Sequence, residues 1–180
     1  MSIPRGHCLR NDLALRLAAA SAQPPRDYLF VSTHDQRMTV VAGGEIAAEY
    51  SVSTSRFGTG NRQGSNQTPQ GVHRIARKIG EGVPPGRIFR SRVDTGLTWA
   101  PGMDQENLIL SRIMWLEGLE DGVNRGPGID SHDRYIYIHG TNREDAVGVQ
   151  PVSHGCVCMR NSDVIDLFDR VKEGTLVIID

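Results

Sequence analysis

The stretch SHGCVCMRN, residues 153–161, places two cysteines one residue apart, directly behind a His-Gly pair. On a strand, His154, Cys156 and Cys158 would share one face, because successive side chains point to opposite sides. Three interpretations are open at this point: a nucleophilic cysteine, a metal site built on the His-x-Cys-x-Cys run, and a buried strand without chemistry. The neighbouring sequence bears on all three.

The segments around this stretch predict a mainly β fold with a few helices, in the α+β class. Runs of β-branched and apolar residues between glycine or proline turns are typical of strands. The strands predicted in this way are 29–32, 38–41, 45–52, 72–80, 134–140 and 175–180. Residues 108–120 fit a strand or a short helix equally well. Residues 161–174 predict a helix capped by Asn161 or Ser162.

Composition restricts the class of protein. The chain has 180 residues, with 38% hydrophobic and 23% charged residues, which is typical of one globular domain. The net charge of -1 gives no basic field, so we expect no nucleic-acid partner. Three cysteines, an odd number, argue against a disulfide framework. No window approaches the roughly 20 apolar residues of a spanning helix, so no membrane partner is expected.

The first 25 residues read as an N-terminal extension with a short amphipathic helix. Its apolar run LALRLAAA, residues 13–20, contains Arg16 and follows Asp12. A charge is costly in a segment that must enter a membrane, so the run makes a poor export signal. We therefore expect a cytoplasmic protein, with a periplasmic location as the alternative if the segment acts as an atypical signal.

Two features near Cys156 favour a reactive thiol. A histidine within reach is the minimum for nucleophilic catalysis by cysteine, and His139 ends a predicted strand while His154 lies two residues before Cys156. The predicted helix start near Asn161 would lower the pKa of a nearby thiol. Residues 56–71 form a long Gly-rich loop, a kind of segment that often carries function.

His139-Gly140-Thr141 followed by Ser153-His154-Gly155-Cys156 resembles the active-site signature of the L,D-transpeptidase catalytic domain family (YkuD-type). The upstream TPQG, residues 68–71, and the downstream MRNSDVIDLF, residues 159–168, are similar to two further motifs of that family. The resemblance covers residues 26–180. It implies a single β-sandwich-like catalytic domain over that range, without a cofactor.

The resemblance also implies roles for individual residues. Cys156 would attack the carbonyl of the third residue of a peptidoglycan stem peptide and release D-Ala, leaving a thioester. His139 would be the general base, oriented by the carbonyl of Gly140. Backbone N–H groups around Gly155 and Cys156 would form the oxyanion hole. His154 would shape the site and is the alternative base.

One position departs from the family pattern, because Cys158 stands where the family usually has Arg or Asn. Arg160 would bind a substrate carboxylate, a task that suits a guanidinium. Arg143 and Arg134 are further candidates to replace the missing donor, and Ser153 is a further candidate substrate contact. A Cys-x-Cys pair is a poor chelate for one tetrahedral ion, so no metal is expected.

The acceptor of the acyl group separates the functional alternatives. Water as the acceptor would make an L,D-carboxypeptidase of murein recycling, which we favour because no convincing export signal is present. An amine acceptor would make an exported L,D-transpeptidase that forms cross-links. A third alternative, from another class, is a non-catalytic or metal-binding module on the same fold.

Overall fold

The computed structural model of the chain describes residues 25–103 and 107–180, and the helix predicted near the N-terminus falls on residues 1–24, outside these ranges. One α-helix, α2 (Asn161–Arg170), is present in the described part. The strands are β1 (Tyr28–Ser32), β2 (Arg37–Ala42), β3 (Glu45–Ser51), β4 (Gly71–Ile79), β5 (Arg87–Arg90), β6 (Val93–Thr98), β7 (Ile109–Gly118), β8 (Tyr137–Gly140), β9 (Val157–Met159) and β10 (Leu176–Ile179).

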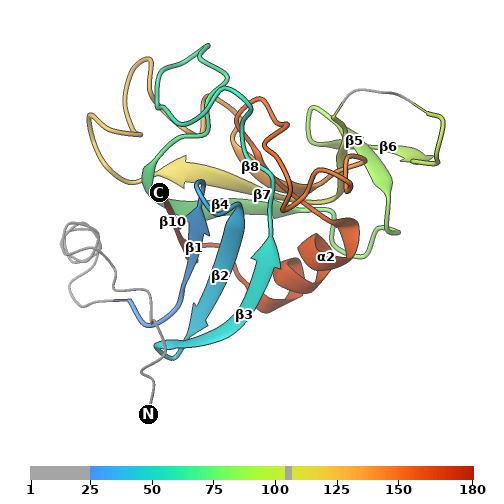
Figure 1. The fold of residues 1–180 in the computed structure, drawn as a ribbon, viewed down its shortest axis with the longest axis horizontal. Helices are drawn as coiled ribbons and strands as arrows, with labels where there is room; N and C mark the ends of the chain where they lie inside the picture. The colour runs from blue at the N-terminus through green and yellow to red at the C-terminus, as the bar shows by residue number, and fades with distance from the viewer. Residues whose placement is uncertain (1–24, 104–106) are drawn as a thin grey trace.

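The strands form one sheet that branches at β7. Its main path runs β3-β2-β1-β10-β4-β7-β5-β6, while β8 pairs with β7 and β9 pairs with β8. The branch lies at an irregularity of β7, where Ser111 has a left-handed φ of 65° and the register with β8 shifts between Leu110 and Ile113. Figure 1 shows β1, β2 and β3 at one end, the β5–β6 hairpin at the other, and α2 beside the sheet.

The main core is formed by strands of this sheet together with α2. Alternating side chains of the strands point inward, and the helix adds Val164, Leu167 and Phe168 from one face. The strand residues of this core are Leu29, Val31, Met38, Val40, Ile75, Met114, Leu116, Ile138, Val157, Met159, Val177 and Ile179. The mainly β, single-domain fold predicted from the sequence is confirmed. No helix in residues 25–103 and 107–180 is long and apolar enough to cross a membrane.

The structure decides one element that the sequence left open and corrects two others. Residues 108–120, which were compatible with either class, form strand β7. The strand predicted over 134–140 begins only at Tyr137, because Tyr135 has a left-handed φ of 57° in a turn closed by its N–H and the His132 carbonyl. Helix α2 has Arg160 at its N-cap without a side-chain cap, and the Asn161 side-chain oxygen accepts from the Ser111 hydroxyl instead.

The β5–β6 hairpin was not among the predicted elements. Its strands are four and six residues long, and β6 contains no buried residue. Short, exposed strands lack the apolar alternation that marks a strand in a sequence. This hairpin brings Arg92 toward the residues around Cys156.

Candidate active site

His139 lies on the buried strand β8, and the last residue of that strand, Gly140, orients its ring. Its Nδ1 lies 2.8 Å from the carbonyl oxygen of Gly140, as expected from the sequence. Because a carbonyl only accepts, Nδ1 carries the proton and Nε2 is left as an acceptor. Gly140 has no room for a side chain, since a Cβ there would lie 2.5 Å from Asn161 Oδ1 and 2.7 Å from the Leu110 carbonyl oxygen.

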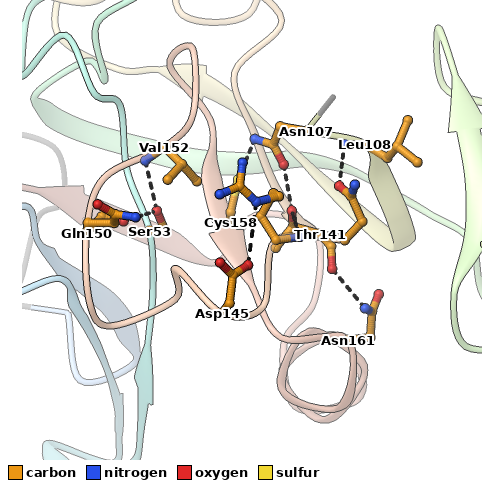
Figure 2. Close-up of polar contacts among 11 residues, drawn as sticks. Ser53, Asn107, Leu108, Thr141, Asp145, Gln150, Val152, Cys158 and Asn161 are labelled. Carbon is orange, nitrogen blue, oxygen red and sulfur yellow. Dashed lines mark hydrogen bonds and ion pairs between the residues drawn. The ribbon is translucent and has the colours of Figure 1, made fainter. Parts of the chain in front are cut away.

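The Nε2 atom of His139 faces Cys158. The parallel register of β8 and β9 pairs His139 with Cys158, and Nε2 lies 3.7 Å from Cys158 Sγ. The Asn107 amide donates to the same sulfur at 3.3 Å, and the Thr141 hydroxyl donates to Asn107 Oδ1 at 2.6 Å. Figure 2 shows Asn107 and Thr141 beside Cys158. The Cys158 sulfur accepts from Asn107, so its own hydrogen is directed to His139 Nε2. Thr141, Asn107 and Cys158 thus each donate to the next group, ending at the imidazole.

Cys156 lies in the bend directly before β9 and is the more accessible of the two thiols. It is partly exposed, whereas Cys158 is 0% exposed. Its Sγ accepts from the backbone N–H of Tyr137 at 3.4 Å and lies 3.6 Å from the carbonyl oxygen of Tyr135. No hydrogen bond joins Cys156 to His139 within the described ranges. The thiol that contacts His139 in this structure is Cys158.

The ionisation of these groups is governed by burial. Burial raises the pKa of Cys156 to about 11, against smaller lowering effects of the Tyr137 N–H and the Arg134 charge. Burial likewise raises the pKa of Cys158 to about 12 and lowers the pKa of His139 to about 4. The expectation that the helix start lowers the pKa of Cys156 is therefore wrong, because desolvation of the thiolate dominates. At neutral pH the resting site holds protonated thiols and a neutral imidazole.

The turn that presents Cys156 is braced from inside by Ser153. This side chain is fully buried, and its hydroxyl donates to the Cys156 carbonyl at 2.6 Å and accepts from the Gly155 N–H at 3.2 Å. Ser153 is thus a support of the turn and not the substrate contact that the sequence suggested. The Gly155 N–H is used here, which leaves the Cys156 N–H as the better candidate for an oxyanion donor. Gly155 has a φ of +128°, which favours glycine.

Arg134 ties the loop of residues 56–71 to this turn. Its guanidinium donates to the carbonyls of Gly60 at 3.0 Å and Gln67 at 2.6 Å. Partial burial lowers the pKa of Arg134, and the neighbouring Cys156 has the opposite, smaller effect. Arg134 is therefore the predicted arginine that lies beside the thiol, and both of its terminal NH2 groups donate to the loop.

The sequence profile of the YkuD family, described as the L,D-transpeptidase catalytic domain, matches residues 26–179. The chain belongs to this family. A Bacillus subtilis protein named provisionally as an L,D-transpeptidase, YqjB, is 52% identical over 159 residues, which is 87% of this chain and 72% of YqjB.

Solved L,D-transpeptidases share the fold. An L,D-transpeptidase from Mycobacterium smegmatis is 18% identical with a TM-score of 0.52, over 86% of this chain and 58% of that one. L,D-transpeptidase 3 from Mycobacterium tuberculosis, in complex with a faropenem-derived adduct, is 16% identical with a TM-score of 0.54, over 87% of this chain and 60% of that one. The chain thus spans about three-fifths of these two proteins, and at this identity the likeness concerns the fold.

Three other side chains proposed for the site from the sequence have polar partners other than Cys158 and His139. His154 is exposed, and its Nε2 lies 2.8 Å from the guanidinium of Arg56. Arg160 donates to the Val147 carbonyl at 3.2 Å. Arg143 lies 3.5 Å from a carboxylate oxygen of Asp145.

The metal site considered from the sequence is not assembled in the described ranges. No group of three or more His, Cys, Asp or Glu side chains there is placed to hold an ion. His154 contacts Arg56, and its ring centre lies 5.7 Å from that of Phe57.

Two residues of this L,D-transpeptidase site were missed in the sequence. Asn107 donates to Cys158, but an isolated Asn beside a strand carries no recognisable signal. Arg92 donates to the Tyr137 hydroxyl at 2.9 Å, and its guanidinium carbon lies 4.5 Å from the centre of the Trp115 ring. The run RIFRSRV, residues 87–93, is rich in arginine, but nothing local shows which arginine turns toward the site.

Proposed function

We propose that this protein is a cysteine acyl-transfer enzyme that acts on peptidoglycan stem peptides, with Cys156 as the nucleophile. The observation that carries the proposal is a partly exposed thiol directly before β9, the strand that pairs with β8, which carries a buried, neutral imidazole. Membership of the L,D-transpeptidase family supplies the substrate class. The bond attacked is the L,D peptide bond before the terminal D-Ala.

In the first step the neutral imidazole of His139 accepts the thiol proton while the new bond forms. As Cys156 Sγ forms a bond to the carbonyl carbon, its proton passes to Nε2 of His139, which is neutral because burial lowers its pKa to about 4. The Cys156 N–H would stabilise the oxyanion. The intermediate then collapses, the proton moves from the imidazolium to the leaving nitrogen of D-Ala, and a thioester remains on Cys156.

The choice of His139 as the base is supported by the partner of the other histidine. A guanidinium has only donors, so His154 Nε2 must accept from Arg56 and is not free to take a proton from a thiol. In the proposed reaction, His139 Nε2 exchanges its partner Cys158 for Cys156. Cys156 lies two residues before Cys158 in the chain, and its Sγ contacts the backbone N–H of Tyr137, on the same strand as His139.

Cys158 is the competing nucleophile, because it is the thiol that contacts the base. Its sulfur is fully buried and accepts a hydrogen bond from Asn107, so a peptide carbonyl could reach it only after rearrangement. We therefore assign Cys158 to holding the resting imidazole. This assignment agrees with the family signature, in which the nucleophile follows Ser-His-Gly.

For the second step we propose water as the acceptor, which makes the enzyme an L,D-carboxypeptidase of murein recycling in the cytoplasm. The approach to Cys156 is bordered by the loop of residues 56–71, tied down by Arg134, and by the exposed ring of Tyr135. Water needs less room at such a thioester than the amine of a second stem peptide. An amine acceptor, and hence cross-linking, is the alternative outcome of the test.

The test is D-Ala release from a purified tetrapeptide, with and without an added amine such as a free D-amino acid. We expect D-Ala and tripeptide as products, and little exchange product when the amine is present. Peptide dimers or complete exchange of the terminal residue would overturn the choice of water. Failure to release D-Ala under either condition would overturn the proposed activity itself.

A further inference from the structure

A guanidinium lies over an aromatic surface next to the thiol and is not part of the family signature. Arg92, in the turn between β5 and β6, has its guanidinium carbon 4.5 Å from the centre of the Trp115 ring and 4.8 Å from that of Tyr135. It also donates to the Tyr137 hydroxyl at 2.9 Å. Tyr135 and Tyr137 are the residues whose backbone atoms contact Cys156 Sγ.

Arg92 retains donors for a ligand. A guanidinium has five N–H donors, and contact with aromatic faces uses none of them. No carboxylate of the described chain forms an ion pair with Arg92, and its hydrogen bond there is the one to Tyr137. The Arg92 guanidinium, with unused donors and packed on aromatic rings near the thiol, can therefore bind an anion.

The other arginines near the site are engaged elsewhere. Arg134 is used by the carbonyls of Gly60 and Gln67, and Arg160 lies against the Val147 carbonyl and 3.9 Å from Asp163. Arg143 faces Asp145 at 3.5 Å. Among these arginines, Arg92 is the one without a carbonyl or carboxylate partner in residues 25–103 and 107–180.

The turn that carries Arg92 is built at a conformational cost. Ser91 and Arg92 have φ values of 47° and 68°, although neither is glycine. Non-glycine residues in the left-handed region are uncommon and need support from their surroundings. Here the support is the Arg92 side chain itself, held by Trp115, Tyr135 and Tyr137.

We propose that Arg92 binds a carboxylate of the stem peptide and thereby selects a third residue whose side chain ends in a carboxylate, as in diaminopimelate, over one that ends in an amine alone, as in lysine. The inference rests on the proposed function and names the substrate class of that site. Arg92 lies one tyrosine side chain away from the contacts of Cys156. That separation suits a carboxylate at the end of a long side chain better than the D-Ala carboxylate next to the scissile bond.

The experiment compares three tetrapeptides that differ only in the placement of carboxylates. One has a diaminopimelate-type third residue, the second has the side-chain carboxylate converted to an amide, and the third has the terminal D-Ala carboxylate converted to an amide. Release of D-Ala or its amide is followed by mass spectrometry for the wild type, Arg92→Gln and Arg92→Lys. Arg90→Gln is the matched control, since it removes the same charge from an exposed position of the same hairpin.

We expect wild-type kcat/KM to fall about tenfold or more when the side-chain carboxylate is amidated, the usual scale for a lost charged hydrogen bond, with most of the loss in KM. Arg92→Gln should give this lower kcat/KM both with the side-chain carboxylate and with its amide. Arg92→Lys should restore part of the preference for the carboxylate, and Arg90→Gln should behave as wild type.

An equal loss for all peptides in Arg92→Gln would show that Arg92 only holds the hairpin and would overturn the inference. Sensitivity to amidation of the terminal D-Ala alone would overturn the choice of carboxylate. A wild type that releases nothing from any peptide would refute the proposed function instead. In that case calorimetric binding of the same peptides to Cys156→Ala still tests Arg92.

Discussion

The resting thiol of Cys156 should be protonated at neutral pH, and its alkylation by iodoacetamide measures this directly. With a pKa of about 11, the thiolate is about one part in a thousand at pH 8, against about a quarter for a thiol of pKa about 8.5. The more basic thiolate is more nucleophilic, which recovers roughly tenfold of that difference. Cys156 should therefore react about 20-fold more slowly than glutathione at pH 8.

The pH dependence separates this account from a preformed ion pair. Because thiolate is the reactive form, the rate should rise about tenfold for each pH unit from pH 7 to about pH 10. Peptide mapping by mass spectrometry distinguishes Cys156 from the slower, buried Cys158, and glutathione in the same buffers corrects for the reagent. A rate that levels off between about pH 6 and 7 would show a thiolate–imidazolium pair and would refute the argument from burial.

Three further perturbations follow from the same structure. Arg134→Gln removes a charge that lowers the pKa of Cys156, so its alkylation at pH 8 should slow further, and an unchanged rate would contradict that effect. Gly140→Ala would place a Cβ 2.5 Å from an asparagine oxygen; it should cost about 1–3 kcal/mol in thermal or urea unfolding, and a wild-type midpoint would contradict the clash. His73 and His139 have folded pKa values of about 4, below the unfolded value of about 6.5. The unfolded state therefore binds protons first, and the free energy of unfolding should fall by about 3 kcal/mol per histidine between about pH 6.5 and 4; urea titrations that give equal values at both ends would contradict this.

Most strands could be predicted from the sequence, because the alternation of apolar residues that marks them lies within each strand. β1, β2 and β10 were predicted within one or two residues, since one face of each is buried in the core. The β5–β6 hairpin was missed because little of it is buried, and it is the element that holds Arg92. The turn at Tyr135 interrupts a run that alternates well, so only tertiary contacts reveal it.

The site was predictable to the level of its motifs but not of its contacts. The His-Gly and Ser-His-Gly-Cys runs identify the chain segments, and the Gly140 carbonyl contact of His139 follows from the family pattern. Which sulfur faces the imidazole depends on the register of β8 and β9, a non-local property. The raised pKa of Cys156 depends on burial by neighbours from several elements, which a local argument about the helix start cannot include.

The central claim is that Cys156, and not Cys158, is the nucleophile, although His139 contacts Cys158 in the resting structure. The direct measurement is D-Ala release from the tetrapeptide by Cys156→Ala and Cys158→Ala, together with the mass of the protein after exposure to a carbapenem. Cys156→Ala should release no D-Ala and gain no adduct, whereas Cys158→Ala should retain both activities. Loss of release and adduct in Cys158→Ala, with both retained in Cys156→Ala, would contradict the account.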